Sequence, residues 1–70
     1  MIDLKNEQGQ FLQDLCDVNG RSLHIRNDGF LETADIYDGC DRQQFQTVEE
    51  AIRWEAGYIR AREYIESLCM

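Results

Sequence analysis

The residues that could carry chemistry are three cysteines, one histidine and the acidic side chains around D-I-Y-D-G-C-D, residues 35–41. A catalytic cysteine at Cys40 needs a base such as His24 and an oxyanion hole. The sequence gives no sign that these two residues meet, so an idle thiol is the favoured interpretation. A four-ligand metal site would need Cys16, His24, Cys40 and Cys69, and their long spacings contain no C-x-x-C or H-x-x-H pattern. We therefore predict no metal, no cofactor and no catalytic activity.

The acidic side chains form a series along the middle of the chain, and five of them are candidates for binding a partner: Asp28, Glu32, Asp35, Asp38 and Asp41. A calcium loop of the EF-hand type needs oxygen ligands at positions 1, 3, 5 and 12 and a glycine at position 6. The stretch from residue 35 to 41 has neither that spacing nor the closing glutamate. Two interpretations remain: the aspartates near Gly39 shape a turn, or the series forms an acidic face that binds a basic partner.

The balance of charge narrows the choice of partner. The chain has 14 acidic and 7 basic residues, which gives a net charge of −7. Nucleic-acid binders carry a basic patch, and none is visible here, so we expect no direct binding to nucleic acid and none to anionic membranes. An acidic surface suits a basic protein partner, including one that itself binds nucleic acid. The alternative is that the charge only aids solubility.

Length and hydropathy place the chain among small globular proteins. Its 70 residues, 43% of them hydrophobic, predict one domain over residues 1–70 with a thin core. No apolar run approaches the ~20 residues of a membrane span. The N-terminal residues lack the basic head and apolar stretch of a signal peptide, and an odd number of cysteines favours free thiols. We therefore predict a cytoplasmic protein of a bacterial host.

Turn signals divide the first two thirds of the chain into strand-sized intervals. Asn19-Gly20 is typical of a type I′ hairpin turn, and Asn27-Asp28-Gly29 and Asp38-Gly39 follow at similar spacing. The sequence therefore predicts an antiparallel meander of three or four strands over about residues 10–46. Residues 11–18 also fit a helical spacing, and the Asn-Gly pair that follows favours a strand there. Ile2 and Leu4 are a candidate leading strand that ends in a turn at Gly9.

The last third predicts one amphipathic helix over about residues 48–68. Thr47 and Glu50 form a capping box at its start. Gly57, inside the helix, predicts either a bend or a close approach of the sheet. Glu55 and Arg62 project near the middle of the apolar face, so they rim the sheet edge or face a second chain. Three aromatic residues of this helix are further candidates for binding a partner, because aromatic and arginine side chains dominate interfaces: Trp54, Tyr58 and Tyr64.

Two resemblances bear on function. The stretch G-C-D-R-Q-Q-F-Q-T-V-E-E-A-I, residues 39–52, is similar to the strand-to-helix segment of HicB-like antitoxins, although their DNA-binding tail has no counterpart. The whole chain resembles small acidic phage anti-CRISPR proteins in size, charge and lack of catalytic motifs. That resemblance implies a DNA mimic whose carboxylates block a basic nucleic-acid-binding surface.

We thus expect an α+β protein, an antiparallel meander packed by one helix, that works by binding rather than catalysis. The expected function is inhibition of a basic, nucleic-acid-binding protein by an acidic surface, in a protein encoded by a phage or mobile element. The alternatives are an antitoxin-like protein that neutralises a basic toxin, and a small dimeric adaptor that binds through its aromatic and arginine-bearing helix. A thin core makes a homodimer a further expectation.

Overall fold

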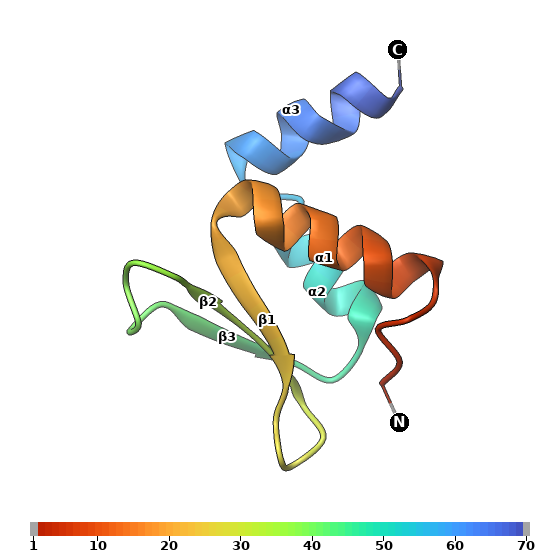
Figure 1. The fold of residues 1–70 in the computed structure, drawn as a ribbon. Coiled ribbons are helices and arrows are strands. Elements are labelled where there is room, and N and C mark those ends of the chain that lie inside the picture. Colours follow the sequence, from red (N-terminus) through yellow and green to blue (C-terminus); the bar gives the residue numbers. More distant parts are fainter. Residues whose placement is uncertain (1, 70) are drawn as a thin grey trace.

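The computed structural model describes residues 2–69 as a three-stranded sheet with three helices, which confirms the predicted α+β class (Figure 1). The elements follow in the order α1 (Glu7–Asn19), β1 (Arg21–Ile25), β2 (Leu31–Asp35), β3 (Arg42–Phe45), α2 (Val48–Glu55) and α3 (Ile59–Leu68). The helices α1 and α2 lie side by side over one face of the sheet, and α3 starts beside the C-terminal end of α1 and diverges from it along its length (Figure 1).

The sheet is the predicted antiparallel meander, with the strand order β1-β2-β3. Two of the three predicted turns connect its strands. Gly29 takes a φ of +90° in the β1–β2 turn, a value that suits glycine because it has no Cβ. In the β2–β3 connection the N–H of Asp41 donates to the carbonyl of Asp38 at 3.0 Å. The two connections lie at opposite ends of β2.

The segment before β1 is the helix α1, and the predicted first strand is wrong. Gly20 does have a positive φ, +71°, but its N–H donates to the carbonyls of Asp17 and Cys16 and closes a helix C-terminus. Glycine in this left-handed conformation serves a helix end as well as a hairpin turn. The helical spacing of the apolar residues decides between them, because Leu12, Leu15 and Cys16 are all fully buried on one face.

The leading residues also differ from the prediction. Ile2 and Leu4 belong to no strand, and Gly9 lies inside α1 instead of in a turn. The side-chain oxygen of Asn6 caps the helix by accepting from the N–H of Gly9 at 2.8 Å. Gly9 is buried against the backbone of Leu4, which occupies the place that a Cβ would need.

The predicted C-terminal helix is interrupted and forms two helices. The Thr47 side chain caps α2 as predicted, by accepting from the N–H of Glu50 at 3.2 Å. The chain turns after Glu55, and the N–H of Gly57 donates to the carbonyl of Trp54 at 3.1 Å. Gly57 thus marks a break larger than the bend that the sequence allowed. α3 then packs against α1.

The core lies between the helix pair and one face of the sheet. Its buried cluster draws on α1, β2, β3 and α2: Leu12, Cys16, Leu31, Phe45 and Ala51. The opposite face of the sheet carries polar side chains, among them the exposed His24 on β1 and Gln44 on β3. With so few large residues in the core, polar contacts inside the molecule have a large share in fixing its shape.

Candidate functional site

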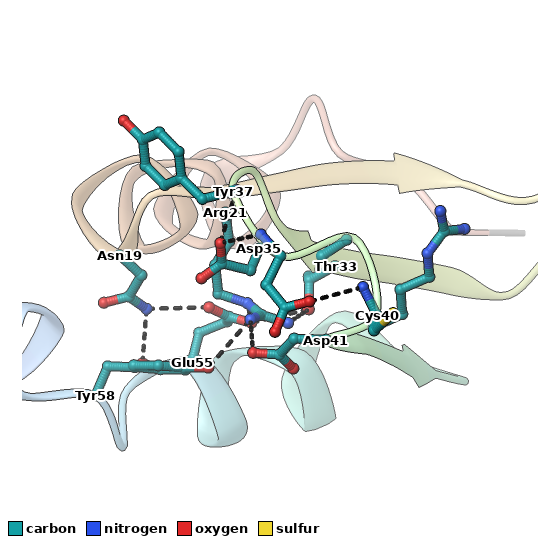
Figure 2. Close-up of polar contacts among 12 residues, drawn as sticks. Asn19, Arg21, Thr33, Asp35, Tyr37, Cys40, Asp41, Glu55 and Tyr58 are labelled. Carbon is teal, nitrogen blue, oxygen red and sulfur yellow. Dashed lines mark hydrogen bonds and ion pairs between the residues drawn. The ribbon is translucent and has the colours of Figure 1, made fainter.

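The guanidinium of Arg21 lies fully buried at the start of β1 and is the centre of a polar network (Figure 2). Its Nε donates to Oε2 of Glu55 at 3.0 Å, and its Nη2 donates to the Thr33 hydroxyl at 3.2 Å. Its Nη1 donates to Oδ2 of Asp41 at 3.0 Å and to the Tyr58 hydroxyl at 3.1 Å. The guanidinium thereby joins β1, β2, the β2–β3 connection, the end of α2 and the residue before α3.

Glu55 is the buried counter-ion of this network. Its backbone carbonyl and its Oε1 each accept from Nδ2 of Asn19 at 3.0 Å. Burial by itself lowers the pKa of Arg21, but Glu55, Tyr58 and Asp41 outweigh it and raise the pKa above its usual value. Arg21 is therefore charged at every pH at which the protein is folded, and a buried charge needs such partners to be tolerated.

The aromatic residues of the C-terminal third pack around this charge. The Cζ atom of Arg21 lies 4.7 Å from the ring centroid of Trp54 and 5.5 Å from that of Tyr58, which is cation–π geometry. Burial raises the pKa of Tyr58. The hydroxyl of Tyr64 donates to Oδ2 of Asp14 on α1 at 3.3 Å. All three aromatic candidates from the sequence are half-buried and have partners inside the chain.

The connection between β2 and β3 is an ordered turn, which we call the acidic loop (residues 35–41). Oδ1 of Asp35 accepts from the N–H groups of Tyr37 and Asp38 at 2.8 and 2.9 Å. These two bonds, that of Asp38 first, lower the pKa of Asp35. At the far end of the loop, the carboxylate of Asp41 is held by the buried Arg21. The loop conformation is thus fixed from within and tied to the core.

The acidic loop exposes two large apolar side chains that the sequence did not single out. Tyr37 is 91% exposed and Ile36 is 59% exposed. The Tyr37 ring points away from the polar network (Figure 2). The interval between the turn signals at Gly29 and Gly39 predicts a strand that includes both residues. Instead β2 ends at Asp35, because the Asp35 side chain bonds the backbone N–H groups of the turn. The available signal in the sequence was the stretch D-I-Y-D-G, in which an aspartate on each side and a following glycine indicate a turn around Tyr37.

The five predicted acidic residues divide into two groups at opposite ends of β2. Asp35, Asp38 and Asp41 lie in the acidic loop. Asp28 lies in the β1–β2 turn, and Glu32 faces the helix-free side of the sheet, where it is only 5% exposed and bonds to neighbouring side chains. The series does not form one continuous face.

The sequence missed the Arg21–Glu55 pair, although both residues left a signal. Glu55 stands in the middle of an apolar helix face, and it is buried there against Arg21. It neither rims the sheet edge nor faces a second chain, as the sequence had suggested. Arg21 lies on the same face of β1 as Leu23 and Ile25, the face toward the helices, so its position is that of a core residue.

The candidate nucleophile and metal ligands lie in separate surroundings. Cys16 is buried, and Cys40 and Cys69 are exposed. Burial, with a contribution from Glu55, raises the pKa of the Cys16 thiol to about 12. Nε2 of His24 lies 3.2 Å from Oε1 of Glu32. Within residues 2–69 no three His, Cys, Asp or Glu side chains come together in an arrangement suited to a metal ion.

Comparisons with protein-family models, with curated proteins and with solved structures find no match to this chain. None of the helices in the described part of the chain combines the length and the apolar character needed to cross a membrane. The fold and the acidic loop therefore carry the functional argument by themselves.

Proposed function

We propose that the chain is a non-catalytic protein-binding inhibitor that docks its acidic loop on a basic surface of a protein target. The observation that carries the proposal is the loop itself, which presents Tyr37 at 91% exposure beside Asp35 and Asp38. Tyrosine is enriched among the residues that dominate binding energy at interfaces. The carboxylates next to it, of the exposed Asp38 and the half-buried Asp35, favour a target rich in lysine and arginine.

The rigidity of the loop supports this proposal. Ordering a flexible loop on binding costs about 0.5–1.5 kcal/mol for each immobilised side chain, and a loop already in its bound shape avoids much of that cost. Here Asp35 bonds two backbone N–H groups, Oδ1 of Asp38 accepts from the N–H of Cys40 at 3.1 Å, and Asp41 is anchored on Arg21. These bonds favour this conformation of the loop before a partner binds.

The net charge of −7 supports the kind of target. Long-range attraction raises the rate of association with a basic protein, and a nucleic-acid-binding protein presents such a surface. The proposed inhibitor excludes nucleic acid from that surface, in the manner of the anti-CRISPR proteins that the chain resembles, and its gene belongs to a phage or mobile element. An antitoxin that neutralises a basic toxin would use the same loop.

The test is affinity capture from bacterial lysate followed by mass spectrometry, with the wild type and three variants of the chain. In D35N/D38N two charges are removed while the oxygen acceptors of the turn stay, and in Y37S the exposed ring is removed. The matched control E63Q/E66Q removes two charges from exposed positions on α3. We expect a basic target that nucleic acid displaces, that both loop variants lose and that the control retains. Retention of the target by D35N/D38N and Y37S would overturn the proposal.

The helix α3 offers a second candidate surface, for the dimeric adaptor. Ile59 is 72% exposed and Leu68 is also exposed. The two residues are nine positions apart, which places them on opposite sides of a helix of 3.6 residues per turn. Because they do not form one apolar stripe, and Trp54 and Tyr58 pack on Arg21, this surface is smaller than the sequence suggested. Light scattering of the wild type and of I59S/L68S tests for the homodimer.

A further inference from the structure

A second charged site lies on the helix-free face of the sheet, and none of the residues that line it belongs to the acidic loop. Its centre is Glu32 on β2, whose neighbours in the strand register are His24 on β1 and Gln44 on β3. A pocket of about 520 Å³ opens above these three residues and is also lined by Arg26 and Arg42. That volume falls within the range of about 300–1,000 Å³ that is typical of small-molecule sites.

Glu32 is the hub that holds the side chains of the pocket. Its Oε1 lies 3.2 Å from Nε2 of His24 and 3.9 Å from Nη1 of Arg42. Its Oε2 accepts from Nε2 of Gln44 at 3.1 Å and from Nη1 of Arg26 at 3.4 Å. The carboxylate is nearly buried at the floor of the pocket, and these contacts with neighbouring side chains compensate its negative charge.

The two arginines keep donors that are free for a ligand. Nη2 of Arg26 contacts Asp28 at 3.3 Å, while its Nε has no partner among residues 2–69. Nε of Arg42 donates to the carbonyl of Gly39 at 2.7 Å, and its Nη2 has no partner in the described part of the chain. The Arg42 side chain is 59% exposed, so these donors are accessible to solvent.

The distribution of charge sets this pocket apart from the rest of the chain. Two arginines and two carboxylates line it, so their charges cancel there. The remainder of the chain carries the whole net charge of −7. The rest of the surface repels an anion. The repulsion is therefore weakest at this pocket, where two guanidinium groups are also present.

We propose that the pocket binds a small-molecule phosphate monoester, with Arg26 and Arg42 donating to the phosphate oxygens. Guanidinium groups bind phosphate and carboxylate through paired N–H donors. Nε of Arg26 and Nη2 of Arg42 can donate to one shared anion. A phosphate monoester brings three terminal oxygens and a charge of about −1.5 to −2 to the two guanidinium groups, whereas a carboxylate brings two oxygens and a single charge. Ile25 and Asn27 also line the pocket, at the end of β1, where the organic part of the ligand would lie.

The test is a titration of the ¹⁵N-labelled chain, followed by amide chemical shifts at constant ionic strength. The probes are a nucleoside 5′-monophosphate, a sugar monophosphate, inorganic phosphate and acetate. We expect saturable shifts at residues 24–28 and 42–44 with the two esters, and weaker binding of the other two probes. R42Q should weaken ester binding by at least about tenfold, and R26Q should do the same. The control R53Q removes an exposed arginine on α2 and should change nothing.

Each other outcome counts against the assignment. Shifts that do not saturate, or that R53Q reduces as much as R42Q does, would mean that the anions only screen the charge of the whole chain. If inorganic phosphate bound as tightly as the two esters, the assignment of a monoester would be wrong. If acetate bound as tightly as the esters, the preference for phosphate would be wrong. The amide spectrum of each variant reports whether the fold is intact. R42Q also removes the bond from Arg42 to the carbonyl of Gly39 in the acidic loop, whereas Arg26 contacts no residue of that loop, so the effect of R26Q is the result that is independent of the proposed inhibitor function.

Discussion

Nε of Arg21 lies 3.0 Å from Oε2 of Glu55, and neither side chain has any exposed surface. The pair is separated by 34 residues and joins the first residue of the sheet to the last residue of α2. The same guanidinium holds Asp41 at the end of the acidic loop. The relationship therefore connects the packing of the core with the shape of the candidate binding surface.

We predict that Arg21 and Glu55 stabilise the fold only as a pair. R21M leaves the buried Glu55 without a cation, which costs about 3–5 kcal/mol, and E55M leaves the buried Arg21 with only the partly exposed Asp41 as its counter-charge, which should cost less. The double variant R21M/E55M leaves no such charge, so its free energy of unfolding should exceed that of either single variant. Urea denaturation followed by the fluorescence of Trp54, the one tryptophan of the chain, measures all three.

The control for this cycle is R53M, which removes an exposed arginine from the neighbouring turn of α2 and should be nearly neutral. A double variant as unstable as the sum of the two single variants would contradict the pairing. The double variant also lacks the contact between Arg21 and Asp41. A second expected result is therefore faster proteolytic cleavage of the acidic loop in R21M/E55M than in the wild type.

The second prediction concerns Gly9, which is buried in α1 against the backbone of Leu4. A methyl group at this position meets backbone atoms, which move only if the N-terminal residues detach from α1. G9A should therefore destabilise the protein by about 1–3 kcal/mol, as overpacking does elsewhere, although alanine is the better helix former. The matched control is G39A, because a Cβ at Gly39 meets open space. Thermal unfolding measures both, and equal midpoints would contradict the prediction.

The sequence predicted the elements whose local signals have one meaning. The Thr47 cap and the turns at Gly29 and Gly39 formed where they were expected. The signal at Gly20 has two meanings, because a positive φ ends a helix as readily as it makes a hairpin turn. Which one occurs depends on whether residues 7–19 are covered by another element, and that is tertiary information.

The site was harder to predict because it depends on pairs that are distant in the chain. A charged residue on an apolar face, such as Glu55, has no explanation until its partner Arg21 is placed beside it, and one sequence does not supply that pairing. Tyr37 posed the reverse problem. Tyrosine is common in β-strands, but Tyr37 lies outside β2 and is exposed, because the turn that starts at Asp35 ends the strand before it.

The third prediction distinguishes the three thiols. Cys16 is buried and its pKa is raised to about 12, whereas Cys40 and Cys69 are exposed. Because the thiolate is the reactive form, Cys16 should resist a thiol reagent at pH 8 in the native protein. Titration with such a reagent should count two thiols in the folded chain and three in urea. Rapid reaction of all three without denaturant would show that α1 opens locally.

The last prediction follows from the lowered pKa of Asp35, which accepts from the N–H groups of Asp38 and Tyr37. The folded pKa lies below the unfolded value of about 3.9. Between these two values the unfolded chain binds more protons than the folded chain, so stability rises with pH in that window. The contribution of Asp35 is thus fully present above the unfolded pKa and is lost as the pH falls through the folded pKa.

Two substitutions separate this charge effect from the shape of the turn. D35N keeps an oxygen acceptor for both N–H groups but does not titrate, so it should resemble the wild type in shape while its stability depends less on pH below the unfolded pKa of about 3.9. D35A removes the acceptor, so it should be destabilised at neutral pH as well. Denaturation curves from pH 2 to 7 measure both effects. If D35N kept the full acid slope of the wild type, another carboxylate would be its source, and the ordered acidic loop would not depend on the charge of Asp35.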